Sequence, residues 1–79
     1  MGKLIVGVPA DTEGGKLFLT DLRSEDNRLF IRYGSTYNKV GFQETEIFTS
    51  DNGENYVITG DDGTVLWRFN RFWIDKLKE

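Results

Sequence analysis

The chain has 79 residues, which is enough for one small domain over residues 1–79 and too few for a second. It contains no cysteine and no histidine, so disulfide bonds are excluded and the usual ligands of zinc and haem are missing. The formal net charge is −3, from 13 acidic and 10 basic side chains, and this mild acidity disfavours a nucleic-acid partner. Packing must stabilise the domain, and six Phe, three Tyr and two Trp residues are available for it.

Residues 4–8 are the first predicted strand, with Leu4, Val6 and Val8 sharing one face. The apolar run around them is too short for a signal peptide's apolar region and far too short to span a membrane. We therefore expect a cytoplasmic protein with no membrane partner. A loop over residues 9–15 follows, and it ends in two glycines.

Two further strands are predicted over residues 16–22 and 28–33, joined by a polar turn. In the first, Leu17 and Leu19 share one face, and Leu22 lies on the other. The second has the clearest alternation in the chain: Leu29, Ile31 and Tyr33 face one way, and Arg28, Phe30 and Arg32 face the other. This alternation predicts that Leu29 and Ile31 are buried in the core.

The next segment, residues 34–42, is the least regular part of the chain. Residues 34–38 are a predicted loop, and the run from Lys39 to Phe42 is a candidate start for the next strand. Tyr33 and Tyr37 lie at this Gly/Ser/Thr-rich loop and form one candidate contact surface.

Three strand-like runs, residues 45–49, 55–59 and 64–69, are separated by turns that contain Asn-Gly and Asp-Gly. They predict a three-stranded antiparallel meander. Because such turns need a residue with positive φ, we expect that conformation at Gly53 and Gly63. The same pattern places Ile58 and Val65, together with Leu29 and Ile31 of the earlier strand, in the core.

The C-terminal segment, residues 70–77, is ambiguous. Its Phe, Trp and Ile residues favour a tight turn followed by a short strand. The alternative is a short helix capped by Asn70, in which Phe72, Trp73 and Leu77 share a face.

These elements predict an all-β fold: a single small antiparallel barrel of five to six short strands, with a C-terminal turn and strand or a short helix. The order of elements in the C-terminal third resembles that of SH3-like small β-barrels. The residues that support this resemblance are Tyr56-Val57-Ile58-Thr59, Gly60-Asp61-Asp62-Gly63, Leu66-Trp67-Arg68-Phe69 and Phe72-Trp73-Ile74. An OB-like barrel is the nearest alternative, but it normally needs a longer chain.

Catalytic chemistry has little support in the sequence. Nucleophilic catalysis usually needs a histidine base beside Ser, Cys or Thr, and the chain has none. Residues 51–55 superficially resemble a calcium loop, but glycine occupies the position of the middle ligand. We therefore expect no enzyme, no catalytic residue, no bound metal and no cofactor.

The segment from Trp67 to Trp73 holds four aromatic residues and two arginines among seven residues. Aromatic and arginine side chains dominate protein–protein hot spots, so we expect the interaction site at Arg68, Arg71, Phe72 and Trp73. The competing interpretation is that both tryptophans and Phe69 belong to the core.

The sequence favours a protein-binding module, or a small inhibitor or accessory protein of the kind encoded by phages and mobile elements. Its expected partner is another protein, and self-association is a further candidate. One alternative is a single-stranded nucleic-acid binder that uses the same aromatic and arginine residues. A second alternative is a small-ligand binder with its site in the barrel mouth.

Overall fold

The computed structural model describes residues 4–9, 15–36 and 41–78. Tyr37, the loop residues 10–14 and the predicted strand start at Lys39 lie outside these ranges. The elements in chain order are β1 (Ile5–Pro9), β2 (Lys16–Glu25), β3 (Arg28–Ser35), β4 (Gln43–Ser50), a 3₁₀ turn η1 (Asp51–Gly53), β5 (Asn55–Thr59), β6 (Val65–Asn70) and α1 (Arg71–Lys78).

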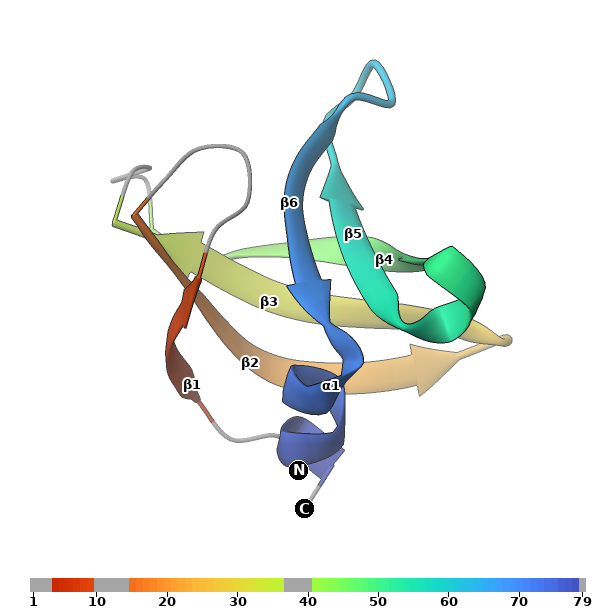
Figure 1. Cartoon of the computed structure of the whole chain (residues 1–79), viewed down its shortest axis with the longest axis horizontal. Coiled ribbons are helices and arrows are strands. Elements are labelled where there is room, and N and C mark those ends of the chain that lie inside the picture. Colours follow the sequence, from red (N-terminus) through yellow and green to blue (C-terminus); the bar gives the residue numbers. More distant parts are fainter. Residues whose placement is uncertain (1–3, 10–14, 37–40, 79) are drawn as a thin grey trace.

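The six strands form one antiparallel sheet in the order β1-β2-β3-β4-β5-β6, so every strand pairs with its neighbours in sequence. The sheet curls into a half-barrel (Figure 1), and in the described part of the chain its two outer strands, β1 and β6, do not pair with each other. The prediction of a small all-β, antiparallel fold is confirmed. The predicted meander is confirmed as β4, β5 and β6.

Apolar side chains from all six strands and from α1 fill the concave side of the sheet. The buried cluster consists of Val8, Leu17, Leu19, Ile31, Tyr33, Ile47, Tyr56, Ile58, Trp67, Phe69, Ile74 and Leu77. Ile31 and Ile58 are fully buried, as predicted. Leu29 and Val65 are only half-buried, so the prediction of full burial was wrong for both. Leu29, next to the start of β3, still packs against the core cluster, whereas Val65 lies beyond a register shift that places Leu66 against the cluster instead.

Two further β-bulges, in β1 and β2, change which side chains face the core. In β1 the register shifts between Ile5 and Val8, where Gly7 has a φ of 84°. A bulge places two consecutive residues opposite one and so reverses the facing beyond it. Val8 is therefore buried while Leu4 and Val6 are exposed, and the prediction that all three share a face was wrong.

The second bulge lies in β2, where the register shifts between Thr20 and Arg23 and Asp21 has a φ of 54°. As a result Leu22 packs against the core cluster, on the side that Leu17 and Leu19 also face. The predicted opposite facing of Leu22 was wrong for the same reason as in β1.

The C-terminal segment is a helix, so the turn and strand that the sequence favoured are wrong and the helical alternative is confirmed. Its predicted face was wrong in part, because Phe72 is exposed while Leu77 is buried. The side-chain Oδ1 of Asn70 accepts a hydrogen bond from the backbone N–H of Phe72 at 2.8 Å, which caps the first turn. Ile74 and Leu77, one turn apart, are buried against the sheet. The burial of this face stabilises a helix that would be marginal in isolation.

Candidate functional site

A pocket of about 210 Å³ lies between the two outer strands of the half-barrel, next to the start of α1. Its lining comes from the end of β1, the start of β5, the end of β6 and the helix: Val8, Pro9, Asn55, Arg68, Phe69, Asn70 and Trp73. We call it the β1–β6 pocket. The sequence prediction had singled out two of these residues, Arg68 and Trp73, for an interaction site.

The alternation of side chains along β6 determines which residues reach this pocket from outside. Trp67 and Phe69 are buried, and the Phe69 ring stacks on that of Tyr56 with 6.0 Å between the ring centroids. Arg68, between them, faces the opposite side of the strand and is exposed. The core interpretation is therefore correct for Trp67 and Phe69, and Arg68 is displayed outward.

The two aromatic residues at the start of α1 have different environments. Trp73 is half-buried and packs against the core cluster. The ring of Phe72 is 54% exposed and meets the Trp73 ring edge-on, with 5.2 Å between the centroids. The Lys76 ammonium lies 5.7 Å from the centre of the Phe72 ring, within the range of a cation–π contact.

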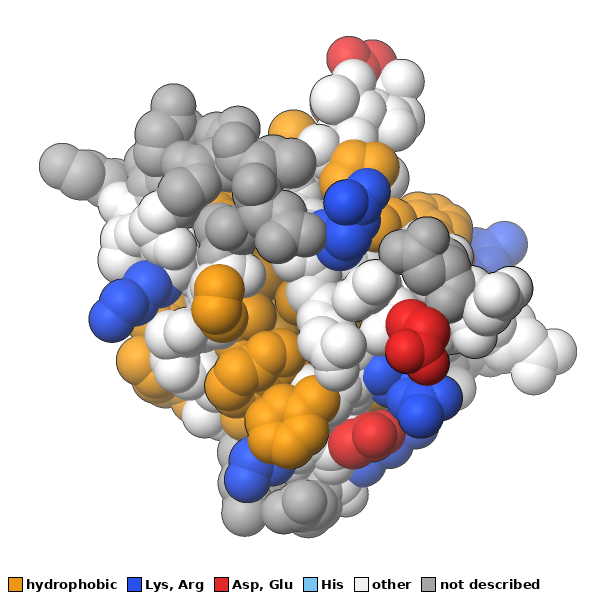
Figure 2. All heavy atoms as spheres, viewed as in Figure 1, with side chains coloured by type: hydrophobic (Ala, Val, Ile, Leu, Met, Phe, Trp, Pro, Cys, Tyr) orange, Lys and Arg blue, Asp and Glu red, His pale blue; other side chains and the backbone are white. Residues whose placement is uncertain are grey.

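Hydrophobic side chains gather over β1 and α1 on the face shown in Figure 2, where both basic and acidic side chains lie beside them. We call the exposed part of this region the Trp73 surface; it consists of Pro9, Arg68, Asn70, Phe72 and Trp73. Leu4 and Val6, also exposed, extend the apolar area along β1.

Arg71 is adjacent to this surface, but part of it has a structural role. Its backbone N–H donates a hydrogen bond to the backbone oxygen of Glu54 at 3.0 Å, which ties the helix start to the turn before β5. Its guanidinium lies 4.0 Å from the Asp75 carboxylate, one helical turn away, and both side chains are exposed. Such a pair contributes little to stability.

The remaining predicted site residues lie elsewhere. Tyr33 is 8% exposed and sits in β3, where it is paired with Leu19 and Gln43. It lines a different hollow from the β1–β6 pocket. Tyr37 lies outside the described residues.

Sequence reasoning missed the residues that the outer strands bring together. Pro9, Asn55 and Asn70 line the pocket although they are far apart along the chain. The only local signal near Pro9 is Gly7, where the left-handed backbone coincides with the register shift of β1. Asn70 was considered as a helix cap, and its place beside the pocket follows from that role.

The charges around the Trp73 surface differ in sign from the chain as a whole. Arg68, Arg71, Lys76 and Lys78 lie on β6 and α1 with one acidic residue, Asp75, so these five side chains sum to +3. The whole chain has a net charge of −3. The surface therefore presents a local positive potential to an approaching partner.

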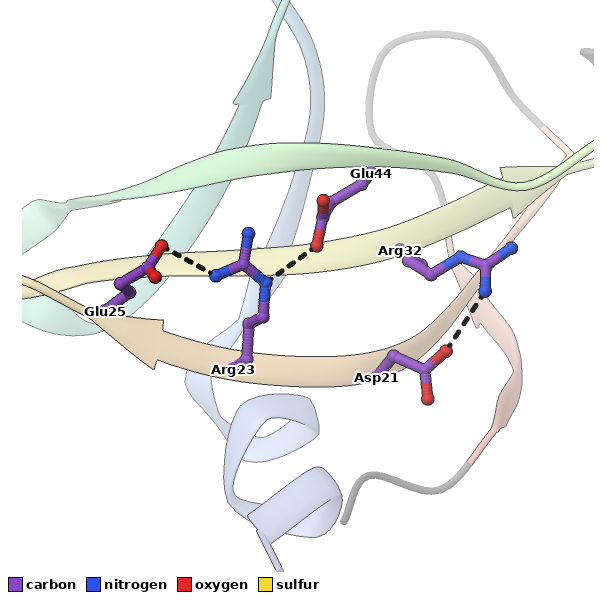
Figure 3. A network of polar contacts seen from close by, with 5 residues as sticks. All are labelled: Asp21, Arg23, Glu25, Arg32 and Glu44. Atoms are coloured by element: carbon purple, nitrogen blue, oxygen red, sulfur yellow. Dashed lines mark hydrogen bonds and ion pairs between the residues drawn. The ribbon is translucent and has the colours of Figure 1, made fainter.

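On the outer face of β2, β3 and β4, charged side chains of both signs form a network of ion pairs (Figure 3). The Arg23 guanidinium bonds the carboxylates of Glu44 and Glu25, each at 2.9 Å, and Arg32 lies 3.4 Å from Asp21. The hydrogen bond from Arg23 holds the pKa of Glu44 below its usual range. This face leaves little uncompensated charge for a partner.

No group of three or more acidic side chains in the described ranges is arranged to hold a metal ion. Across the same residues, no helix is long and apolar enough to cross a membrane. Comparison with protein-family models, with curated proteins and with solved structures finds no match to this chain.

Proposed function

We propose that this protein is a non-enzymatic binding module that holds a segment of another protein against the Trp73 surface. The observation that supports the proposal is the convergence of an exposed Phe72 ring, a half-buried Trp73 and an outward Arg68 beside one pocket. Aromatic residues and arginine around a partly desolvated pocket are the usual composition of a binding hot spot. A small inhibitor or accessory protein, of phage or mobile-element origin and acting in the cytoplasm, fits this role.

The expected partner segment combines apolar side chains with carboxylates. Its apolar part would cover Phe72 and the edge of the β1–β6 pocket, and its carboxylates would face Arg68 and Lys76. Charge complementarity of this kind increases the association rate and selects among partners more than it increases affinity.

A single-stranded nucleic acid is the second candidate, because a cation lies over an exposed aromatic ring at Phe72. The geometry favours it less than a protein. Stacking platforms present several ring faces to successive bases, whereas Trp73 is half-buried and turns edge-on to Phe72. A small ligand is favoured least, since ligand pockets usually measure about 300–1,000 Å³ and this one measures about 210 Å³.

The half-barrel architecture is also compatible with the SH3-like resemblance of the C-terminal third, which we retain as a proposal about fold family. It adds nothing to the binding proposal, because the chain has Trp67-Arg68 and not the paired tryptophans with which proline-binding members of that group hold their ligands.

The binding proposal is tested by selecting peptides from a random displayed library against the purified protein. Affinities of the enriched peptides are then measured for the protein and for Phe72→Ala and the double variant Arg68→Ala with Arg71→Ala. We expect enriched peptides to combine apolar and acidic residues, and each variant to lose about 2 kcal/mol, roughly 30-fold in Kd. Phe48→Ala is the matched control, because Phe48 is 47% exposed and lies on β4, which contributes no residue to the pocket.

Unchanged affinity in both variants, with the fold intact, would place the site elsewhere. Salt then separates the two partner classes. An oligonucleotide held through phosphates loses affinity steeply as salt rises, whereas a peptide held mainly through Phe72 does not. A labelled single-stranded oligonucleotide that binds more tightly than the selected peptides would replace the protein partner by the nucleic acid.

A further inference from the structure

Besides the β1–β6 pocket, the sheet has a second gap in its strand pairing, where β5 diverges from β4. These strands pair only from Ile47 to Ser50 on β4, opposite Asn55 to Ile58 on β5. Residues 43–46 of β4 pair with β3 on one side. On their other side no strand among the described residues pairs with them.

A bulge explains why β5 turns away at this point. The pairing of β5 with β6 shifts register between Ile58 and Thr59, so that Leu66 is an extra residue on β6. Bulges bend a strand and increase its local twist. Beyond the bulge, β5 and β6 rise together as a hairpin away from β4 (Figure 1), and acidic side chains lie at the hairpin tip (Figure 2).

The divergence leaves a hollow of about 370 Å³, which we call the β4–β5 notch. The residues that line it are Tyr33, Gln43, Glu44, Thr45, Thr59, Gly60, Asp61 and Leu66. Its volume falls in the range of about 300–1,000 Å³ that is typical of ligand sites. Tyr33 and Leu66 supply buried and half-buried apolar surface, and the strand edges supply polar groups.

The shape of the notch corresponds to an absent strand. An extended segment placed there would continue the line of β5 and pair with residues 43–46, a length of about 13 Å. Along a strand, backbone N–H and C=O groups point alternately to the two sides, so about half of those in residues 43–46 point away from β3. An exposed edge of this kind is a template for an added strand.

The charge of the notch indicates which kind of peptide segment would bind there. Two carboxylates, Glu44 and Asp61, belong to its lining, and no lysine or arginine does. Arg23 already bonds Glu44 at 2.9 Å. In the adjacent turn, Asp62 accepts a hydrogen bond from the backbone N–H of Thr64 at 3.0 Å. Asp61 is therefore the carboxylate best placed to meet an incoming cation.

We propose that the β4–β5 notch binds an extended peptide that carries a lysine or arginine, which adds a strand to residues 43–46 and places its cation at Asp61. This site does not depend on the Trp73 surface. It differs from that surface in lining, in charge and in the way it holds its partner, because backbone pairing supplies the contact and the side chain supplies the selection.

The test uses short synthetic peptides of alternating threonine and valine with one central lysine and blocked ends, titrated into ¹⁵N-labelled protein. We expect amide shifts at residues 43–46 and 59–61. Two N-methylated forms of the peptide, each blocking one edge, separate strand pairing from nonspecific contact. One form retains the affinity of the parent peptide and the other loses binding, because only one edge of an added strand faces β4.

Asp61→Asn tests whether Asp61 contacts the cation of the peptide. We expect it to weaken the lysine peptide about two- to fivefold, as for an exposed ion pair, and to leave a norleucine version of the peptide unchanged. Asp26→Asn, at another exposed turn aspartate, is the matched control and is expected to have no effect.

Three results would overturn the proposal. They are shifts that map away from residues 43–46, equal binding of both N-methylated forms, and equal affinity of the lysine and norleucine peptides for the unmodified protein. Concentration-dependent shifts of the same amides without peptide, together with a dimer in sedimentation, would assign the notch to a second copy of the chain and would also overturn it.

Discussion

The half-barrel opens in two places, and the two openings are built differently. Beside the β1–β6 pocket, helix α1 packs against the sheet: Ile74 and Leu77 are buried in the core, and Trp73 lines the pocket with Phe69 and Arg68. At the β4–β5 notch no helix of the described residues contributes to the lining, which is mostly polar and includes two carboxylates. The comparison shows that unpaired strand edges in one small sheet can differ. The edge at the β1–β6 pocket is lined by side chains of the helix and strands, whereas the edge at the β4–β5 notch presents backbone groups.

The two openings differ because the large apolar residues near them are unevenly distributed along the chain. The segment that ends the chain carries Phe72, Trp73 and Ile74 and packs them beside the first opening. The second opening is flanked by the turn Gly60 to Gly63, whose residues are small or acidic. A partner at the first opening therefore meets side chains that are already ordered, whereas a partner at the second must supply its own strand.

The largest expected effect comes from removing the packing beneath the first opening. Ile74→Ala should cost about 2–5 kcal/mol of unfolding free energy, because the side chain is fully buried and the lost methyl groups leave a cavity. Denaturant unfolding measures the loss, and hydrogen exchange should show that α1 becomes the least protected element. A cost below about 0.5 kcal/mol, typical of surface sites, would mean that the helix does not close this side of the sheet.

The next effect concerns two glycine turns: that of Gly63 is next to the second opening, and that of Gly53 lies at the other end of the β4–β5 pairing. Gly53 and Gly63 have φ values of 86° and 85°, as the sequence predicted. Alanine at either position should cost about 1–2 kcal/mol, because a Cβ is disfavoured in the left-handed region. An added Cβ would meet no atom within 4 Å at either glycine, so this cost comes from the backbone alone.

Gly60→Ala is the matched control for these variants. Its φ lies outside the left-handed region, and an added Cβ would make ordinary contacts of 3.5 Å and 3.6 Å with Asp62 and Leu66. Thermal unfolding of the three variants distinguishes a cost that comes from a left-handed backbone from a cost that comes from an added methyl group. Equal melting temperatures for all three would show that the left-handed turns do not determine the stability of the hairpin.

A smaller effect is expected at the helix cap. Asn70→Ala removes the acceptor for the Phe72 N–H and should cost about 1 kcal/mol. Asn70→Ser, which keeps a capping oxygen, should recover most of that stability. Because Asn70 also lines the β1–β6 pocket, a selected peptide should lose affinity with the alanine variant in parallel with the loss of α1 order. A stable Asn70→Ala protein with an intact α1 would show that packing alone fixes the helix.

The strands with uninterrupted alternation could be predicted from the sequence. Ile31 and Ile58 lie in such runs, and both are fully buried. The prediction of which side chains face the core was wrong where a bulge interrupts the alternation, at Gly7 and Asp21. A glycine permits many conformations, and an aspartate with positive φ has no distinct sequence pattern, so neither bulge could be read from local composition.

The candidate site was predictable only in part. Alternation along β6 placed Arg68 opposite Trp67, and this was correct. The helix was missed as the first choice because strand propensity favoured Phe72, Trp73 and Ile74, whereas the burial of Ile74 against the sheet decides the structure. The contribution of Pro9 depends on the approach of β1 to β6, which is a long-range consequence of the whole sheet.

The smallest expected effect is a pH dependence that belongs to the notch side of the molecule. Glu44 has its pKa lowered by the hydrogen bond from Arg23, and Asp62 has its pKa lowered by hydrogen bonds from Thr64. A carboxylate with a lower pKa in the folded state stabilises the fold above its unfolded pKa. That stabilisation is lost as the pH falls through the folded value. Because the ordinary pKa values of glutamate and aspartate are about 4.3 and about 3.9, the melting temperature should begin to fall below about pH 5.

Glu44→Gln and Asp62→Asn should each flatten this acid limb while changing the melting temperature at neutral pH only slightly, because both carboxylates are exposed. Asp26→Asn is the control, since Asp26 lies in an exposed turn without a hydrogen bond or ion pair to the described residues. If Asp26→Asn flattened the acid limb as much as the other two variants, the pH dependence would come from overall charge. In that case the pH dependence would not distinguish the two openings, and only their packing and shape would.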